Sequence, residues 1–583
     1  MRAAWCLLLA SACGAGSGMG LSAPDNDPVA LRRALSAARK PLAGPKNATG
    51  KPLVFYVAAG KIGAFDLGAR KDLWSLDGTP DGRFVVGHKL VVAREKTDLV
   101  ARDVSTGRPA WRHPLPPKAK LTGVAADGDR FFYVAGGEAV ALDENGNVLW
   151  REHGADLGAP AAAQGLVFVP HLHQWLSLLD GQTGKPYTRL RCLEEKVSFV
   201  RAGEDGVVYG SRGAFFLDEK AAQGSRHGAT YHRPELPEFA KPILGQDAYL
   251  ASGSGYSALD RSRVLWRAQP TPPGKQLSFA NDTMVVLHFR YFVAVDGGGA
   301  VKWALREARD VAAAEQHGNA IVFVTTGGEI ASLDVETGAR ASLGSVGKRA
   351  AGATIDAAGW KAPEGEPPLP VPQALAQIVR DRDVRFAAVK KWAAMALGAL
   401  PEGANGLTAA LIDAVRDPQA PPDVVAAAGK SLAKRIQPNE VSLLAPGLSV
   451  HTDFLTGTKP RGIGALAGAA ATHKSVSLVP LLVEQLEDPA TTDADLAAIA
   501  KALADIGDHT AFGPLANLLI IHRADPGANL ESGPWNAVAE AVRDVGGAEG
   551  RAFLAHVAAD PRTAAAIGSA ARSALAVEAG KAK

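Results

Sequence analysis

The sequence predicts a multidomain protein with two parts, an all-β eight-bladed β-propeller followed by an all-α solenoid of about six helix pairs. Two periodicities carry this prediction. An Asp that ends a short alternating strand recurs eight times in residues 51–356, at spacings of 37, 40, 37, 38, 42, 36 and 38 residues. An Asp that ends a helical segment recurs six times in residues 372–578, at spacings of 36, 36, 35, 37 and 35 residues. Strand repeats near 40 residues indicate a ring of small sheets, and helical repeats of this length indicate stacked helix pairs.

The β repeat is clear in "LVARDVSTGRPAW", where a strand reaches Asp103, a turn follows at Thr106 and Gly107, and a new strand opens at Trp111. Asp can accept hydrogen bonds from amides of its own turn, and Gly permits the left-handed backbone there. The aromatic residue can pack between neighbouring sheets. The structural positions predicted in this way are Asp66, Trp74, Asp103, Trp111, Asp143, Trp150, Asp180, Asp260, Trp266, Asp296, Trp303 and Asp334, with Asp218 in a weaker copy.

One complete copy shows the expected blade. The stretch "LTGVAADGDRFFYVAGGEAVALDENGNVLWRE" divides into strands at 121–126, 130–135, 138–143 and 147–152, with Gly and Asp at each turn. Four strands in about 38 residues form one propeller blade. Eight copies would therefore end near residue 356.

The ring is predicted to close with a strand from the far end of the repeat. The stretch "PLVFYVAAG" at 52–60 has the pattern of a second strand, yet only the loop-like "PKNATGK" precedes it. After the last blade, "AGATIDAAG" at 351–359 has the pattern of a first strand that no second strand follows. Residues 351–356 are therefore expected to pair beside 52–59, so that the first blade has no open edge.

The N-terminal residues predict export. Residues 1–20 combine Arg2 with the apolar run "AAWCLLLASA", which is too short to span a membrane. Cys13 follows this run, and the segment resembles the lipobox of bacterial lipoproteins, with Ala10 where Leu is usual. A plain secretory signal is the alternative. Residues 21–50 are expected to be a tether, and the chain is placed in the periplasm or on a membrane of a Gram-negative-type envelope through a lipid on Cys13.

Composition narrows the possible partners. Of the 583 residues, 21% are charged and 47% are apolar, as in ordinary globular proteins. The net charge is +3 and no Lys/Arg run is interleaved with aromatic residues, so nucleic acid is not an expected partner. Cys192 is the one Cys outside the signal region, which leaves the mature chain without an intramolecular disulfide if Cys13 is removed or lipidated.

The repeat "ALD…TG…W" resembles the PQQ-type propeller repeat over residues 51–356. Two groups carry this repeat: quinoprotein alcohol and sugar dehydrogenases, and BamB-type periplasmic propellers, which are lipoprotein scaffolds in outer-membrane barrel assembly. The resemblance to the dehydrogenases would imply a quinone and Ca²⁺ held by a ring of two adjacent Cys, a Trp floor and Asp, Glu and Asn oxygens. This chain has no Cys-Cys pair. We therefore expect no cofactor and no quinone-dependent catalysis.

Other candidates for chemistry are few. The stretch "HLHQW" places His171 and His173 two residues apart, on one face of a predicted strand. Paired His can bind Zn²⁺, but no third ligand is evident nearby, so a structural role is favoured. The chain contains no GxSxG, P-loop or HExxH motif. No catalytic residue, cofactor ligand or metal ligand is predicted.

A proline-rich segment at 357–371 separates the two repeats and is expected to be an extended, semi-rigid linker. In the helical repeat, Pro follows Asp in four of the six copies and prevents the helix from continuing. The second helix of each pair follows, as in "ADLAAIAKALADIGD", and this layout resembles HEAT repeats over residues 372–578, with an armadillo-like array as the alternative. The repeated positions are Asp381, Asp417, Asp453, Asp488, Asp525 and Asp560.

Two repeat arrays favour a non-catalytic, protein-binding scaffold of the bacterial cell envelope, with other envelope proteins as partners. The alternative is a periplasmic sensor that holds a small molecule in the propeller channel. A quinoprotein-type oxidoreductase is the least favoured function. The helical part departs from BamB-type proteins, which consist of the propeller alone.

Overall fold

The computed structural model describes residues 46–191, 199–203, 206–210, 214–216, 262–266, 284–296, 300–400, 406–525, 527 and 534–579, apart from residues 79, 164, 174 and 348. Contacts divide the chain into two compact units, Met1–Leu369 and Pro370–Lys583. The predicted export signal, Cys13, most of the tether, Cys192, Asp218 and Asp260 lie outside the described residues.

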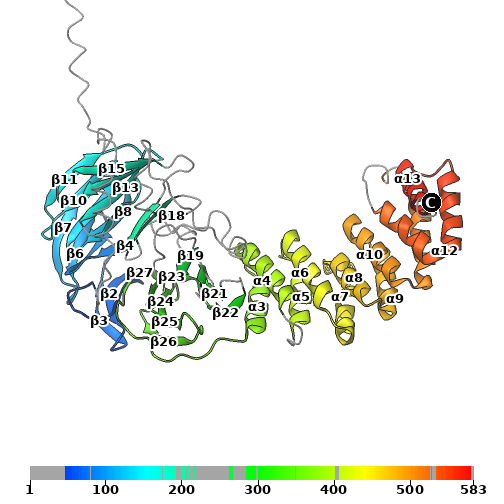
Figure 1. Ribbon diagram of the computed structural model, residues 1–583, viewed down its shortest axis with the longest axis horizontal. Coiled ribbons are helices and arrows are strands. Elements are labelled where there is room, and N and C mark those ends of the chain that lie inside the picture. The colour runs from blue at the N-terminus through cyan, green and yellow to red at the C-terminus, as the bar shows by residue number, and fades with distance from the viewer. Residues whose placement is uncertain are drawn as a thin grey trace, which may run out of the picture. The chain divides into compact units, whose positions relative to one another are not determined.

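The described part of the first unit forms seven antiparallel sheets (Figure 1). The first has the strand order β27(Ala350–Asp356), β1(Leu53–Ala58), β2(Lys61–Asp66), β3(Lys71–Asp77). The second runs β4(Pro80–Val86), β5(Leu90–Glu95), β6(Asp98–Asp103), β7(Pro109–Pro114). The third runs β8(Leu121–Asp127), β9(Arg130–Ala135), β10(Glu138–Leu142), β11(Val148–His153). The fourth runs β12(Ala161–Ala163), β13(Leu166–His171), β14(Trp175–Asp180), β15(Pro186–Arg191).

The fifth sheet has three described strands, β16(Phe199–Gly203), β17(Gly206–Gly210) and β18(Ala214–Phe216). The sixth runs β19(Ser262–Trp266), β20(Met284–His288), β21(Tyr291–Val295), β22(Val301–Arg306). The seventh runs β23(Val311–His317), β24(Ala320–Thr325), β25(Glu329–Asp334), β26(Arg340–Ser345). In the third sheet, the four strands begin and end within one residue of the predicted bounds.

Seven sheets account for seven of the eight predicted blades. The remaining blade is the one that carries Asp260; most of its predicted length lies within residues 217–261, outside the described part of the chain, and it stays a prediction. The repeat pattern places Trp266 on the last strand of that blade. The structure instead pairs β19 with β20, from Ser262↔His288 to Trp266↔Met284, so this strand opens the sixth sheet. Alternation identifies a strand but not its neighbour, because the same pattern fits either edge of a sheet.

Successive sheets pack face to face through apolar clusters. Phe55 and Trp74 of the first sheet meet Val91 of the second, and comparable clusters join the second to the third, the third to the fourth and the sixth to the seventh. Tyr56 and Ile355 of the first sheet share a further cluster with Leu343 of the seventh. The last sheet therefore packs against the first, which is the arrangement of a closed propeller.

The predicted ring closure is confirmed. Strand β27 pairs with β1 in antiparallel register, from Leu53↔Asp356 to Ala58↔Ala350. The buried carboxylate of Asp356 also accepts hydrogen bonds from the backbone N–H groups of Lys46 and Asn47, at 3.0 and 2.9 Å, and from Asn47 Nδ2 at 2.6 Å. The two ends of the propeller are thus joined by a strand and by a carboxylate clamp.

The start of the proline-rich segment packs on the propeller. Trp360 contacts the cluster between the first and seventh sheets. Glu366 and Arg340, at the outer strand β26, exchange two backbone hydrogen bonds of 2.8 Å each. The side chain of Arg340 also pairs with Glu307 at 2.8 Å and with Glu329 at 2.6 Å. Residues 357–366 are therefore attached to the propeller unit rather than free along their length.

The second unit is helical (Figure 1). Its α-helices are α3(Val371–Val379), α4(Ala387–Ala399), α5(Leu407–Arg416), α6(Pro422–Arg435), α7(Ala445–Leu448), α8(Ile463–Thr472), α9(Val479–Leu486), α10(Asp493–Ile506), α11(Phe512–His522), α12(Trp535–Ala559) and α13(Ala565–Ala579). Short 3₁₀ turns precede several of them: η3(Val384–Phe386), η4(Pro438–Leu444), η5(Val476–Leu478) and η6(His509–Ala511).

Contacts between these helices follow chain order. Helix α3 packs on α4, α5 on α6, α7 on α8, α9 on α10 and α11 on α12. Helices α4, α6, α8, α10 and α12 also contact one another in sequence. Gly547 has φ 56° and ψ −124°, which interrupts α12 and divides it into two helical segments. Helix α12 also contacts α13. The predicted helical region after residue 370 is therefore present, and its arrangement as a HEAT-like solenoid of about six pairs stays a prediction.

Candidate functional site

The repeated Asp residues of the propeller organise the turns that follow them. In five copies the Oδ1 atom accepts hydrogen bonds from two amides of its own turn, at 2.7–3.0 Å. These copies are Asp66, Asp103, Asp143, Asp180 and Asp334. Burial raises the pKa of Asp180, but the hydrogen bonds from Tyr187 and Thr183 outweigh this effect and hold the pKa below its usual range. The repeated carboxylates therefore act as turn caps, and the hydrogen bonds at Asp180 favour its ionised form.

The repeated Trp residues join each sheet to the next one. The indole N–H of Trp74 donates to the carbonyl of Val104 at 2.8 Å, and that of Trp150 donates to Gly181 at 3.1 Å. Trp111 and Trp303 make the same bond, to Glu144 and Val335, at 2.9 and 3.0 Å. In every case the acceptor directly follows the repeated Asp of the next sheet. We call each such contact a Trp–turn dock.

A glycine completes each dock. Gly107, Gly146, Gly184 and Gly338 all have positive φ, between 71° and 81°. A Cβ atom at any of them would lie 2.6–2.9 Å from the Trp ring of the preceding sheet. Glycine is therefore required twice, by the left-handed turn and by the ring that packs on it. The position that corresponds to Trp74 in the seventh sheet is Ser342, so the closing seam relies on β27 and Asp356 instead.

His171 and His173 do not share a strand face, contrary to the sequence prediction. Strand β13 ends at His171, and both Leu172 and His173 have positive φ, so His173 lies in a turn. His171 is buried, accepts or donates a 2.7 Å hydrogen bond with Ser177, and has its pKa lowered to about 4 by burial and by Arg189. His173 is exposed and pairs with Asp156 at 3.2 Å. The two rings therefore have separate structural roles.

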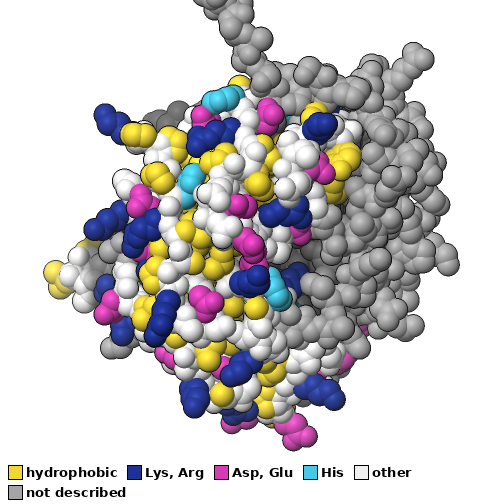
Figure 2. Space-filling view, turned by 90° about the vertical axis from the view of Figure 1, so that its left-hand side faces the viewer, with side chains coloured by type: hydrophobic (Ala, Val, Ile, Leu, Met, Phe, Trp, Pro, Cys, Tyr) yellow, Lys and Arg dark blue, Asp and Glu magenta, His cyan; other side chains and the backbone are white. Residues whose placement is uncertain are grey.

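Residues of the third and fourth sheets line an open depression on the described surface of the propeller. Its carboxylates are engaged: Asp129 accepts the backbone N–H of Lys89 at 2.6 Å, and Glu144 pairs with Lys89 Nζ at 3.5 Å. On the face shown in Figure 2, Lys and Arg are interspersed with Asp, Glu and apolar side chains. The residues that line the depression are Asp129, Arg130, Asp143, Glu144, Leu149 and Gln182.

Within the described ranges, no three His, Cys, Asp or Glu side chains are placed to hold one metal ion. None of the helices in the same ranges combines the length and apolar character that crossing a membrane requires.

The most exposed apolar side chains in the described residues lie on one loop of the helical unit. This segment, residues 449–462, connects α7 to α8, and we call it the Phe454 loop. Phe454 is 82% exposed and Leu455 is 98% exposed. Asp453 sits at the start of the tip, where its carboxylate accepts hydrogen bonds from the amide of Leu455 and the hydroxyl of Thr456 at 2.8 and 2.7 Å. An isolated β-bridge between Asp453 and Thr458 closes the tip.

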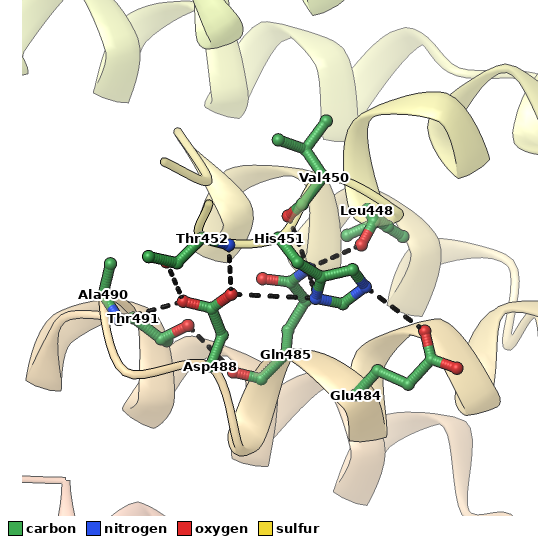
Figure 3. Close-up of polar contacts among 9 residues, drawn as sticks. All are labelled: Leu448, Val450, His451, Thr452, Glu484, Gln485, Asp488, Ala490 and Thr491. Carbon is green, nitrogen blue, oxygen red and sulfur yellow. Dashed lines mark hydrogen bonds and ion pairs between the residues drawn. The ribbon is translucent and has the colours of Figure 1, made fainter. Parts of the chain in front are cut away.

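The next helix pair fixes the base of this loop (Figure 3). Gln485 on α9 is fully buried, and its Nε2 donates to the carbonyls of Leu448 and Val450 at 2.7 and 2.9 Å. Asp488 accepts the backbone N–H of Thr452 at 2.7 Å and a second bond from its hydroxyl at 2.5 Å. These bonds join residues 35–37 positions apart, which is one repeat. The loop is therefore held by the same inter-repeat register that stacks the helices.

His451 adds ionic contacts to this clamp (Figure 3). Its Nε2 lies 3.4 Å from Glu484, and its Nδ1 lies 3.7 Å from Asp488. Burial raises the pKa of Asp488, but the hydrogen bonds from Thr452 and Ala490 outweigh burial and lower the pKa. Asp488 is thus an ionised anchor for the loop at neutral pH.

Asp488→Asn is expected to destabilise the helical unit by about 1–3 kcal/mol at pH 7, because the Thr452 donors lose their charged acceptor. A lowered pKa in the folded state means that the stabilisation is present above the unfolded pKa, at about pH 4, and is lost as the pH falls through the folded value. The difference in unfolding free energy between Asp488→Asn and the parent chain should therefore disappear under acid conditions. Urea unfolding between pH 3 and 7 measures it, with the exposed neighbour Glu487→Gln as the control. A loss of stability that is the same at every pH, or that is equal for Asp488→Asn and Glu487→Gln, would contradict the role of Asp488 as an ionised anchor.

Sequence reasoning missed the Phe454 loop, although two signals were present. Asp453 is in register with the repeat but lacks the Pro that follows Asp417 and Asp488. In addition, the segment from Asp453 to the next helical pattern is long and contains two adjacent large apolar residues. Apolar residues in a loop that departs from the repeat have no role in stacking the helices, and they therefore indicate a functional site.

Comparison with known proteins supports the propeller assignment. A family model described as outer membrane protein assembly factor BamB matches residues 58–187 and 97–212. This region carries the PQQ-like propeller repeat that the sequence predicts, and it covers less than half of the chain. No curated protein matches the chain.

Solved propeller structures show similarity over about half of the chain. BamB from Moraxella catarrhalis is 16% identical, with 53% of this chain and 86% of that chain covered and a TM-score of 0.32. The β-propeller domain of Cps50 (Swd1) from Myceliophteria thermophila is 10% identical, with coverage of 49% and 94% and a TM-score of 0.33. The computationally designed Ika8 protein is 15% identical, with coverage of 47% and 95% and a TM-score of 0.33.

Proposed function

We propose that this chain is a non-catalytic protein-binding scaffold of the bacterial cell envelope, exported by residues 1–20 and anchored through a lipid on Cys13. The observation that carries the proposal is the recurrence of the Trp–turn dock at four seams of the propeller. Each dock uses an aromatic ring, a hydrogen bond and a glycine to fix one sheet against the next. Such a ring presents a preorganised surface, which lowers the entropic cost of binding a large partner.

The second unit extends this proposal. Its helices pack in chain order, and polar bonds between successive pairs hold them in register, as between Thr452 and Asp488 or between His473 and Ile436. We propose that it is a HEAT-like solenoid, an architecture that offers an extended surface to proteins. Other envelope proteins are the proposed partners, and the match to the BamB family model over residues 58–212 supports an outer-membrane assembly factor among them.

A crosslinking pull-down from envelope fractions tests the scaffold function. The full-length chain is expected to capture an outer-membrane barrel protein or its assembly factor reproducibly. Trp303→Ala, which removes one dock, should reduce this capture several-fold, because binding depends on a fixed ring. A variant with Phe454→Ser and Leu455→Ser should retain it, since the loop belongs to the other unit.

Two results would contradict the proposal. One is capture that is unchanged when the ring is loosened by Trp303→Ala. The other is a chain that captures no envelope protein but gains thermal stability with a single metabolite, which is the behaviour of a small-molecule sensor.

A further inference from the structure

The Phe454 loop presents its apolar residues in an unusual way for a soluble surface. Among the other exposed large apolar side chains of the helical unit, the most exposed is Ile521, at 64%, and Val384 and Val476 are 60% and 56% exposed. Phe454 and Leu455 are adjacent and almost completely exposed at the end of a closed loop. Exposed large apolar residues that are grouped together mark a binding surface more often than residues that occur singly.

The polar groups of the loop are layered around this tip. The one carboxylate in the loop, that of Asp453, accepts hydrogen bonds from the amides of Leu455 and Thr456, at 2.8 and 3.4 Å, and from the Thr456 hydroxyl. Lys459 and Arg461 are exposed on the arm that returns from the tip to α8. The loop therefore combines the apolar pair Phe454 and Leu455 at its tip with two exposed cations on the returning arm, and its one carboxylate stands at the start of the tip.

This arrangement of an apolar tip and a cationic arm matches the boundary of an anionic bilayer. Apolar side chains favour the depth where headgroups meet acyl chains, while Lys and Arg favour the level of lipid phosphates. The clamp from Gln485 and Asp488 keeps the loop in one shape, so insertion does not require the loop to be ordered first. Asp453 keeps its negative charge, but the two cations of the arm outnumber it, so the loop is cationic on balance.

We propose that the Phe454 loop is a membrane-contact site, which places Phe454 and Leu455 in the interface of an anionic lipid bilayer with Lys459 and Arg461 at the phosphates. The proposal does not depend on a protein partner of the propeller. It gives the helical unit a contact with the bilayer that is separate from any lipid on Cys13.

A site-specific fluorescent label tests this contact in the full-length chain. Leu455→Cys in a background of Cys6→Ser, Cys13→Ser and Cys192→Ser is labelled with an environment-sensitive nitrobenzoxadiazole dye and mixed with phosphatidylglycerol–phosphatidylethanolamine vesicles. The emission is expected to shift to the blue and to rise about twofold or more, because the dye leaves water. The control label is placed at Val476→Cys, which is 56% exposed at the other end of α8 and should show no shift.

Two further variants assign the contributions of the tip and of the arm. In chains labelled at 455, the vesicle concentration for half-maximal shift should rise about tenfold with Phe454→Ser, since most of the apolar area at the tip is lost. Lys459→Glu with Arg461→Glu should weaken the response in anionic vesicles, and unchanged circular dichroism verifies the fold of each variant.

Several outcomes would overturn the proposal. No spectral change at position 455 would show that the loop does not contact lipid, and an apolar pocket of a protein would then be its partner. An equal change at position 476 would show that the response is not specific to the loop. An equal response in phosphatidylcholine vesicles would overturn the assignment to an anionic surface. Loss of lipid contact with intact capture of envelope proteins would separate this failure from failure of the scaffold function.

Discussion

Replacement of residues 351–356 by an equally long Gly–Ser segment is expected to destabilise the propeller by on the order of 5 kcal/mol. Ile355 leaves the apolar cluster between the first and seventh sheets, and Asp356 leaves the clamp on Asn47. Strand β1 also loses one of its two neighbours and becomes an open edge. Because a domain is stable by only about 5–15 kcal/mol, this loss is enough to open the ring.

Calorimetric unfolding of the full-length chain measures this effect, and hydrogen exchange of the β1 amides localises it. The same Gly–Ser replacement at 454–459 is a matched control, because it has the same length and those six residues are exposed. It should shift the propeller transition little, since the loop belongs to the other unit. If the two replacements have equal effects on the propeller transition, β27 is not what closes the ring.

The closure could be predicted from the sequence because it depends on a missing element. The first blade lacks a first strand before Leu53, and a first-strand pattern without a second strand appears near Ile355. In a repeat, every blade needs the same number of strands. A strand that is missing at the start of the repeat and an extra strand at its end are therefore expected to pair with the same blade. The structure adds the clamp of Asp356 on Lys46 and Asn47, which no pattern indicated.

The Trp–turn docks were predictable in position but not in their chemistry. The spacing of Asp and Trp places both residues in five of the eight copies, and apolar area predicts that the ring packs between sheets. The hydrogen bond from Trp74 to the Val104 carbonyl joins residues 30 positions apart, in different sheets. Local alternation describes which face of a strand is buried but contains no information about which neighbour it meets. The same limit explains the pairing of β19 with β20.

The clamp under the Phe454 loop could not be predicted from the sequence, for a different reason. Gln485, Asp488 and His451 are ordinary residues at ordinary helical positions. Their role depends on the distance between adjacent repeats, which brings α9 against the end of α7. A pattern of helices predicts that the pairs stack, but side-chain contacts across the stack follow only from the three-dimensional register.

Trp303→Ala is expected to destabilise the propeller by about 3–5 kcal/mol, because Trp303 is the most deeply buried of the docking rings, at 2% exposed. Trp303→Phe should cost only about 1–2 kcal/mol, since a ring still packs on Gly338 while the bond to the Val335 carbonyl is lost. Trp111→Ala should lie between these values, because that ring is only half-buried.

Urea unfolding followed by circular dichroism measures this series. At the seam between the first and seventh sheets, Ser342 takes the position of the docking Trp, so this seam provides a comparison within the same ring: Ser342→Ala should change the unfolding midpoint very little. The expected order of destabilisation is Trp303→Ala, then Trp111→Ala, then Trp303→Phe, then Ser342→Ala. If Trp303→Ala and Ser342→Ala proved equally mild, the blades would be held by strand pairing and general apolar contact, and the repeated Trp would not be what fixes one blade against the next. The predicted order instead makes the dock the element that converts separate sheets into one rigid ring.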